Sequence, residues 1–232
     1  MTARVLSIVV PAYNEERFIG TLLERIRGVD LASVGVSAEL IVVDDCSKDR
    51  TAEIAAAVPG VRLVRMPVNG GKGRAVRAGI AAATGDLLII QDADLEYDPN
   101  DYVPMVRALY ERGADVVYGS RYLRRGKYRG QSWPAYLGGR SLSLVAWLCT
   151  GHYINDTVTA LKLFPRRLLA DMTLETSGFE LDHEITAKLL ARGCRIVEVP
   201  ITYHPRSKAE GKKIGMRDWF VGASTYWRYR RG

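Results

Sequence analysis

The chain has 232 residues, of which 47% are hydrophobic and 25% are charged; this fits one large α/β domain or two small ones and excludes a disordered chain. Its three cysteines share no metal-ligand spacing, so neither a disulfide framework nor a zinc site is expected. The formal charge of +7 is concentrated in residues 121–130, 205–213 and 226–232, and such patches attract nucleic acid, anionic lipid or phosphorylated small molecules.

Apolar runs and helical patterns alternate through the first half of the chain. Strands separated by helices of this length predict right-handed crossovers and a parallel sheet covered on both faces. Ligands of such sheets bind beyond the carboxyl ends of the strands, where this chain places polar loops. The predicted strands cover residues 6–11, 39–43, 61–65, 87–90 and 116–119, and the predicted helices cover 16–27, 51–57, 73–83 and 102–112.

The second half is less regular. A basic segment from Arg121 leads into a helix-like stretch at 137–150, and a second helical pattern at 180–192 precedes a strand-like run at 195–203. No linker and no repeat interrupts the chain, so we expect a single domain over residues 1–232. No apolar stretch reaches the ~20 residues that cross a bilayer, and no signal-peptide cleavage site is found, which predicts a cytoplasmic protein.

The segment IIQDADLEYDP places carboxylates directly after the predicted strand at 87–90. Asp92, Asp94 and Glu96 are spaced two residues apart, and alternate residues of an extended chain point the same way. These three side chains can therefore converge on one cation. From spacing alone, the alternative is a solvated acidic loop before a helix capped by Asp98 or Asn100.

The segment NGGKGRAVRAG is a second candidate for ligand binding. Its glycines let backbone amides approach an anion at a helix start, and Lys72 and Arg74 add positive charge. It lacks the pattern of ATP-hydrolysing loops, and Val76 stands where the dinucleotide fingerprint needs a third glycine. A tight turn before a helix is the alternative interpretation.

Two polar loops, PAYNEE and DDCSKD, follow the first two predicted strands. Helix capping accounts for one polar residue in each loop, by Asn14 in the first and by Ser47 or Asp49 in the second. Capping does not account for the pair Asp44 and Asp45, whose carboxylates can accept hydrogen bonds from a base N–H and from ribose hydroxyls. Several polar loops at one edge of a sheet therefore favour a nucleotide site.

Two other patterns are assigned to structure. The three histidines are scattered, and a surface or structural role is expected for His152, His183 and His204. An apolar stripe in the helix-like stretch is typical of a face that packs on the core, with membrane contact as the alternative because basic residues precede it. The stripe consists of Leu137, Leu144, Val145 and Leu148 with Trp147.

Five blocks and a tail together resemble a known family of enzymes. They are SIVVPAYNEE, ELIVVDDCSKDRT, NGGKGRAVRAG, GDLLIIQDADLEYDP, DVVYGSRY and the tail YHPRSKAEGKKI. Their order and spacing resemble the inverting glycosyltransferases of the GT-A fold in glycosyltransferase family 2, most of all the dolichyl- and polyprenyl-phosphate mannose synthases. The resemblance implies one α/β domain with a Rossmann-like, mostly parallel sheet flanked by helices. Residues 1–120 would bind the nucleotide sugar and residues 121–232 the acceptor.

The resemblance also implies a role for each matching position. The nucleoside would lie at Pro11, Tyr13, Glu15, Asp44 and Asp45, with Lys72 and Arg74 in the glycine-rich nucleotide segment. The catalytic ion, Mg²⁺ or Mn²⁺, would be held by Asp92, Asp94 and Glu96, where the mannose synthases often have Gln at the third position. Phosphates would face Arg121, Arg140, Arg206 and Lys212.

The implied reaction moves a sugar from a GDP- or UDP-sugar to a polyprenyl or dolichyl phosphate. A divalent ion held by carboxylates stabilises the charge that develops on the diphosphate. A phosphate acceptor is already an anion, so inversion by direct attack needs cations more than a base, and we expect Arg121 and Arg206 to supply them. Without membrane helices in this sequence, we expect the lipid acceptor to be met peripherally, at the cytoplasmic surface of the membrane.

Two other functions compete with this one. Transfer to a sugar or small-molecule hydroxyl would need a base, for which the segment GFELDHEI offers Glu180, Asp182 and Glu184. A basic module that binds nucleotide or nucleic acid without catalysis is the non-enzyme alternative. No nucleic-acid partner is expected, because the acids beside the nucleotide loops repel a phosphate backbone.

Overall fold

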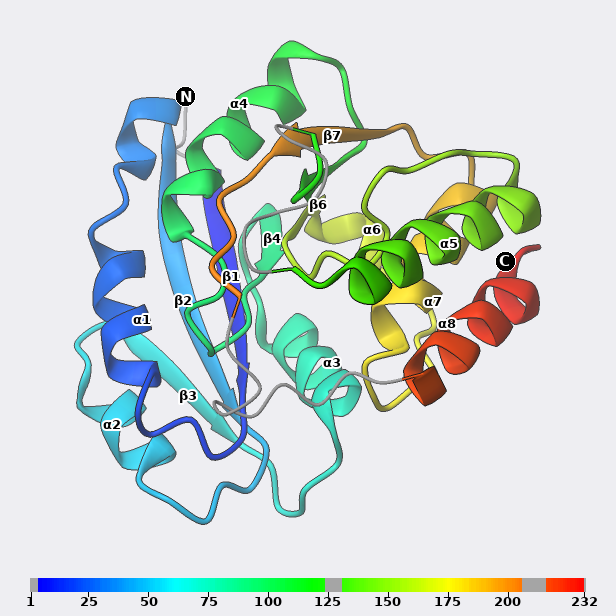
Figure 1. The fold of residues 1–232 in the computed structure, drawn as a ribbon. Helices are drawn as coiled ribbons and strands as arrows, with labels where there is room; N and C mark the ends of the chain where they lie inside the picture. Colours follow the sequence, from blue (N-terminus) through cyan, green and yellow to red (C-terminus); the bar gives the residue numbers. More distant parts are fainter. Residues whose placement is uncertain (1–3, 124–130, 206–215, 232) are drawn as a thin grey trace.

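The strands form one sheet in the order β3-β2-β1-β4-β6-β5-β7 (Figure 1). The computed structural model describes residues 4–123, 131–205 and 216–231. The strands are β1 (Arg4–Ala12), β2 (Val36–Asp44), β3 (Val61–Arg65), β4 (Leu87–Ile90), β5 (Val116–Ser120), β6 (Lys162–Pro165) and β7 (Ile196–Pro200). All five strands predicted in the first half are confirmed, and the predicted 195–203 strand corresponds to β7.

Six of these strands run in one direction and one runs against them. β1 pairs in parallel with β2 and β4, and β5 pairs in parallel with β7, whereas β6 is antiparallel to both β4 and β5. The carboxyl ends of β1, β2, β4 and β5 therefore meet at one edge. The expected mostly parallel α/β sheet is confirmed.

Helices cover both faces of the sheet. The helices are α1 (Ile19–Arg27), α2 (Thr51–Ala57), α3 (Lys72–Ala82), α4 (Tyr102–Glu111), α5 (Trp133–Thr150), α6 (Arg166–Ala170), α7 (Leu181–Ala191) and α8 (Met216–Tyr229), with short 3₁₀ turns at Leu31–Val34 and Pro99–Asp101. One apolar layer joins the sheet to α1, α2 and α4, and a second joins the other face to α3, α6 and α7. The helices α5 and α8 form an outer layer against α7 (Figure 1).

The outer layer overturns one expectation. Leu142 and Ala146 are the α5 side chains buried in the outer apolar cluster, together with Tyr226 of α8. The stripe expected to face the core points the other way, since Leu137 is 59% exposed and Leu148 is 70% exposed. The inward side of α5 carries Leu142, Ser143 and Ala146, and most of its other bulky apolar residues lie on the solvent side. Within the described residues, no helix combines the length and the apolar character that crossing a bilayer requires.

Candidate active site

The acidic loop begins where β4 ends. Gln91 is fully buried, and its amide oxygen accepts a hydrogen bond from Tyr102 Oη at 2.8 Å. Its amide nitrogen donates to the backbone oxygen of Asp92 at 2.9 Å. Asp94 Oδ1 accepts the backbone N–H of Glu96 at 3.1 Å, which tightens the turn. The loop is therefore fixed at its base by a buried side chain and closed on itself.

A chain of alternating charges runs from this loop into the protein. Lys72, the first residue of α3, places its Nζ 2.7 Å from Asp92 Oδ1 and 3.4 Å from Asp182 Oδ2. The other oxygen of Asp182 lies 3.0 Å from Nζ of Lys162, a fully buried lysine in β6. Segments distant in the sequence, α3, β6 and α7, are thus tied to the acidic loop by ion pairs.

The charges in this chain set one another's protonation. Burial alone would lower the pKa of Lys72, but Asp92 and then Asp182 raise that pKa above its ordinary value. Burial alone would raise the pKa of Asp182, but Lys162 and then Lys72 hold it below its ordinary value. Burial lowers the pKa of Lys162, and the charge of Asp182 opposes that effect. An ionised Asp182 between two lysines is a weak proton acceptor.

The three acids predicted to share one cation do not gather in one cluster. Glu96 Oε2 accepts a hydrogen bond from Tyr203 Oη at 2.5 Å, beside the isolated bridge between Tyr97 and Tyr203. Asp92 is paired with Lys72. Across residues 4–123, 131–205 and 216–231, no group of three or more His, Cys, Asp or Glu side chains is arranged to hold a metal ion.

The end of β2 carries an incompletely bonded carboxylate. Asp44 is 1% exposed, and its Oδ1 accepts the backbone N–H of Ser47 at 3.2 Å. Its Oδ2 is buried and has no hydrogen-bond partner in the described part of the chain, although Arg65 Nε lies 3.8 Å away. A buried oxygen of this kind costs about 1–3 kcal/mol unless a ligand satisfies it. Asp44 is therefore prepared to accept a hydrogen bond from a ligand.

The neighbouring acid, Asp45, supports the backbone. Its two carboxylate oxygens accept the N–H groups of Gly70 and Gly71, each at 2.8 Å. Each oxygen of Asp45 thus accepts one N–H of the glycine-rich turn, and the expected contact with the nucleoside stays a prediction. Asp45 and Asp44 thus differ in role although they are adjacent, because successive residues at a strand end point in opposite directions.

The amides of the glycine-rich turn are engaged inside the protein. The N–H groups of Gly73 and Arg74 donate to the carbonyl of Ser177 at 2.7 and 3.3 Å. A Cβ on Gly73 would lie 2.7 Å from the carbonyl carbon of Ser177, so only glycine allows this close approach. The start of α3, expected to receive an anion, is capped by the 176–178 segment, while the Arg74 side chain is exposed and folds back over Gly70.

The first loop is held against the second. Pro11, at the end of β1, is buried beside Val43 of β2. The N–H of Glu15 donates to Thr51 Oγ1 at 2.8 Å, and Asn14, with a φ of 55°, accepts the N–H of Lys48 at 2.8 Å. These bonds leave Tyr13 at the surface with 41% exposure, near the end of β2. The expected nucleoside residues Pro11, Tyr13, Glu15 and Asp44 are therefore brought to one edge.

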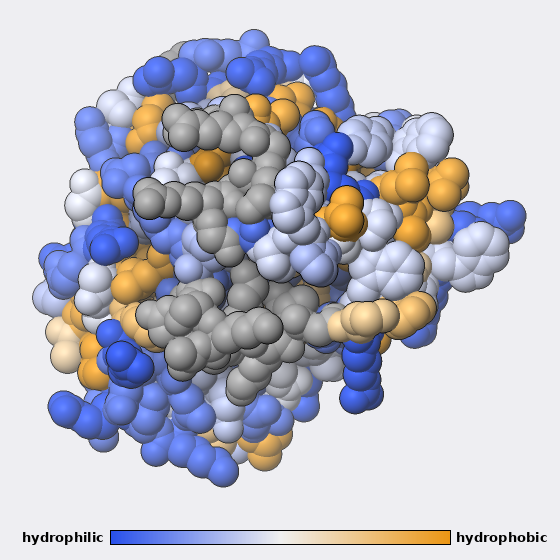
Figure 2. Space-filling view, in the orientation of Figure 1, coloured by the Kyte–Doolittle hydropathy of each residue, from blue (hydrophilic) through white to orange (hydrophobic). Residues whose placement is uncertain are grey.

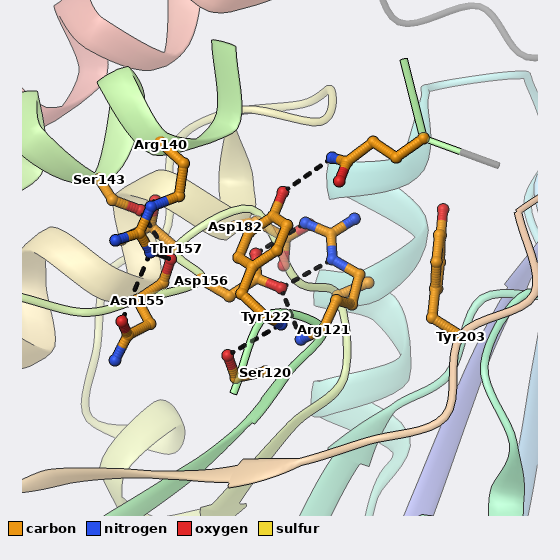
Figure 3. Close-up of polar contacts among 12 residues, drawn as sticks. Ser120, Arg121, Tyr122, Arg140, Ser143, Asn155, Asp156, Thr157, Asp182 and Tyr203 are labelled. Carbon is orange, nitrogen blue, oxygen red and sulfur yellow. Dashed lines mark hydrogen bonds and ion pairs between the residues drawn. The ribbon is translucent and has the colours of Figure 1, made fainter. Parts of the chain in front are cut away.

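A buried ion pair follows β5. Arg121 Nε and Nη2 each lie 2.7 Å from an oxygen of Asp156, and the Arg121 N–H donates to the same carboxylate at 3.0 Å (Figure 3). The guanidinium also lies against two rings, 5.1 Å from the centroid of Tyr203 and 5.6 Å from that of Tyr122. Tyr203 thus stands between Arg121 and Glu96, which links this cation to the acidic loop.

A glutamate that sequence patterns did not single out orients this pair. Glu198 of β7 accepts the backbone N–H groups of Asn155 and Asp156 at 2.8 and 2.9 Å, together with the side-chain amide of Asn155 at 2.9 Å. Burial raises the pKa of Glu198. Its carboxylate fixes the backbone that presents Asp156 to Arg121. Only the fold brings these residues together, so no local motif could have revealed them.

The other predicted basic residues have different outcomes. Arg140 of α5 donates from Nη1 to the carbonyl of Asn155 at 3.0 Å and from Nη2 to Tyr153 Oη at 2.5 Å, and its guanidinium lies 5.9 Å from the centroid of Tyr122. It therefore borders the Arg121 cluster (Figure 3). Arg206 and Lys212 lie outside the described residues.

Of the three acids in the 178–185 segment, only Asp182 is connected to the acidic loop. Glu184 is buried and accepts the N–H groups of Glu175 and Thr176 at 2.9 Å and pairs with Lys188 at 2.7 Å. Glu180 accepts the N–H of Gly178 at 3.0 Å. Two of the candidate bases thus hold the loop before α7, and the third is paired with lysines.

Known proteins similar to this chain identify its family. The family model described as Glycosyl transferase family 2 matches residues 7–171. A dolichol-phosphate mannosyltransferase of Pyrococcus furiosus is 31% identical over 220 residues, which cover 90% of this chain and 59% of that protein. A dodecaprenyl-phosphate galacturonate synthase of Rhizobium johnstonii is 34% identical over 218 residues, which cover 89% of this chain and 61% of that protein. The chain thus spans about three fifths of the length of each.

A solved structure shares the fold. It is glucosyl-3-phosphoglycerate synthase from Mycobacterium tuberculosis in complex with Mn²⁺, UDP-glucose and phosphoglyceric acid, with 26% identity and a TM-score of 0.68 over 89% of this chain and 74% of that chain. The expected family and class of enzyme, a glycosyltransferase, are confirmed by these matches. The chain belongs to glycosyl transferase family 2.

Proposed function

We propose that this protein transfers a sugar, with inversion, from a uridine diphosphate sugar to the phosphate of a polyprenyl phosphate. The observation that carries the choice of acceptor is the pairing of Asp182 with both Lys162 and Lys72. A hydroxyl acceptor needs a base, and the acid connected to the acidic loop is held ionised with a lowered pKa. An acceptor that is already an anion needs none. The printed names of the two relatives refer to dolichol phosphate and dodecaprenyl phosphate, which supports the same class of acceptor.

The donor base is read by Asp44. Uracil presents one N–H between two carbonyl groups, which matches the single unpartnered oxygen, Oδ2. Guanine presents two adjacent donors, which a carboxylate accepts best through both oxygens, and Oδ1 already accepts from Ser47. Cytosine presents an acceptor at the same position and would be repelled. Arg65, 3.8 Å from Oδ2, supplies a donor for a neighbouring carbonyl. The donor is therefore a uridine nucleotide, as in the UDP-glucose complex of the structural neighbour.

The residues of the acidic loop fit a magnesium or manganese ion. Mg²⁺ is often bound by one or two carboxylates together with substrate phosphates, so Asp92 and Asp94 suffice, and Glu96 is left to Tyr203. When bound, such an ion acts as a Lewis acid on the diphosphate leaving group. Lys72 fixes the Asp92 carboxylate through a 2.7 Å ion pair and brings a positive charge to the same place.

The acceptor phosphate is assigned to the cations that follow β5. Arg121 is held in one orientation by Asp156, so its guanidinium loses little freedom when an anion binds. Arg140 borders the same cluster from α5, and Arg206 and Lys212 are added from the family resemblance. This assignment divides the chain into a donor half, residues 1–120, and an acceptor half, residues 121–232, that works at the surface of a membrane.

A transfer assay tests this function. Purified protein would be incubated with UDP-sugars, Mn²⁺ or Mg²⁺ and a short polyprenyl phosphate, and the product would be separated by chromatography. Asp94→Asn should abolish transfer, whereas Asp98→Asn, in the same loop, should not, because asparagine keeps the oxygen that accepts the N–H of Asn100. Full activity of Asp94→Asn, or of the wild type in excess chelator, would contradict the proposal.

A further inference from the structure

The solvent side of α5 is a continuous apolar stripe. Trp133, Leu137, Leu144 and Leu148 are all exposed, by 64%, 59%, 47% and 70%. Their spacing of four, seven and four residues places them on one face of the helix. The single charged residue of α5 is Arg140, and its guanidinium donates to the carbonyl of Asn155. An exposed helix face of this kind needs a partner.

The neighbouring helix α8 presents a matching face. Its exposed positions include Phe220 and Trp227, and the arginines Arg217 and Arg231 lie near its two ends. The guanidinium of Arg230 lies 3.7 Å from the centroid of the Trp227 ring. Buried side chains of α5 and α8 share one cluster, so the two faces are adjacent. All four tryptophans of the chain lie on these two helices.

We define the α5/α8 face as the surface formed by six exposed side chains, Trp133, Leu137, Leu144, Leu148, Phe220 and Trp227. Figure 2 shows hydrophobic side chains gathered on the side of the molecule that α5 and α8 form in Figure 1. Aromatic and leucine side chains flanked by arginine are the composition of helices that lie in a membrane interface.

This face is continuous with the proposed acceptor site. The rings of Trp133 and Tyr136 have centroids 5.8 Å apart, and those of Tyr136 and Tyr122 are 5.5 Å apart. Tyr122 in turn lies against Arg121. A row of aromatic rings therefore leads from the exposed end of α5 to the buried cation. A lipid whose chain remains in a bilayer can reach Arg121 with its phosphate along such a row.

We propose that the α5/α8 face seats on the interface of an anionic lipid bilayer and presents the Arg121 cluster to it. This inference rests on the proposed function for its orientation. A second copy of the chain is a poorer occupant, because a two-fold contact through this face would bring the arginines of α8 against one another. An anionic headgroup layer complements the same arginines, at about 1 kcal/mol or roughly fivefold in partitioning for each.

Flotation with vesicles tests the surface. The probe is phosphatidylcholine with roughly one quarter phosphatidylglycerol, and the variants are Leu148→Ser with Trp227→Ser, and Arg217→Ser with Arg231→Ser. The arginine pair should lower partitioning onto the vesicles about 25-fold, fivefold for each arginine, and the apolar pair should lower it about tenfold. Matched controls away from the face are Tyr110→Ser for the first pair, and Arg25→Ser with Arg112→Ser for the second, all at exposed positions.

Tryptophan fluorescence gives a second readout. Brominated lipids should quench the wild type, because three of the four tryptophans are exposed on α5 and α8. Equal vesicle binding by the face variants and the controls would overturn the proposal. It would also be overturned if light scattering showed that the wild type is a dimer and that the face variants lose only this dimer and keep vesicle binding. Transfer to a short soluble polyprenyl phosphate without vesicle binding would refute membrane binding through the α5/α8 face, and the proposed transferase function would be unaffected. Vesicle binding through the face without any transfer would refute the function alone.

Discussion

Replacing Asp45 by alanine should loosen the turn between β3 and α3. The buried carboxylate accepts the N–H groups of Gly70 and Gly71 at 2.8 Å, and a hydrogen bond to a charged group contributes about 1.5–3 kcal/mol. Water can reach the half-buried turn in the variant, so we use the lower value, about 1.5 kcal/mol, for each of the two hydrogen bonds. The free energy of unfolding should therefore fall by about 3 kcal/mol. For a chain of this size, that corresponds to a decrease in Tm of about 6–12 °C.

Chemical denaturation followed by circular dichroism measures this effect. Asp45→Asn keeps one acceptor oxygen and should lose about half as much as Asp45→Ala. Asp30→Ala is the control. This substitution removes an exposed carboxylate that accepts only the N–H of Ser33, and it keeps the hydrogen bond from the Ser33 hydroxyl to the backbone carbonyl of residue 30. If Asp45→Ala were as stable as the wild type, or no less stable than Asp30→Ala, the structural role assigned to Asp45 would be wrong.

Three further predictions concern charge. Asp44→Asn should weaken UDP binding at least tenfold in calorimetry and strengthen CDP binding, because the amide N–H₂ can donate to cytosine; unchanged nucleotide preference would contradict base reading by Asp44. Asp182→Asn should lower the free energy of unfolding by about 3 kcal/mol, because it leaves the buried charge of Lys162 without a partner. The dependence of the transfer rate on pH should stay as in the wild type. If the variant no longer showed the decrease in rate at low pH, Asp182 would be identified as a base. Burial lowers the pKa of His183 to about 4, whereas the pKa of histidine in the unfolded chain is near 6.5. As the pH decreases, the unfolded chain therefore binds a proton before the folded protein does. The free energy of unfolding should fall by about 3 kcal/mol between pH 6.5 and pH 4. Urea denaturation should show this fall in the wild type and less of it in His183→Gln, and an equal fall in both would refute the assignment.

The first half of the fold was predictable because its order is local. Each strand from β1 to β5 is a short apolar run between helical patterns, and all but β3 are followed directly by a polar loop. The antiparallel β6 was not identified as a strand that enters the sheet between β4 and β5, because pairing partners far apart in sequence leave no periodic signal. The lysine within its apolar run, Lys162, was the available clue that a buried countercharge must exist.

The site was predictable where a motif names the residue, and not where the fold supplies the partner. The edge that holds Asp44, Asp92 and Arg121 followed from the loops after the strands. The roles of Asp156 and Glu198 did not, because they come from a loop and a strand that only tertiary packing joins. The outward stripe of α5 was assigned to the core, since periodicity shows that a helix has an apolar face and not what covers it.

The account is tested most directly by comparing two acceptors that differ in one group. Wild-type protein with a UDP-sugar and Mn²⁺ would be given a short polyprenyl phosphate or the corresponding polyprenol at equal concentration, and the initial rates of transfer would be measured. Because Asp182 is paired with lysines and Arg121 is set to receive an anion, the account predicts transfer to the phosphate and none to the alcohol. Equal rates with both acceptors, or transfer to the alcohol alone, would contradict it.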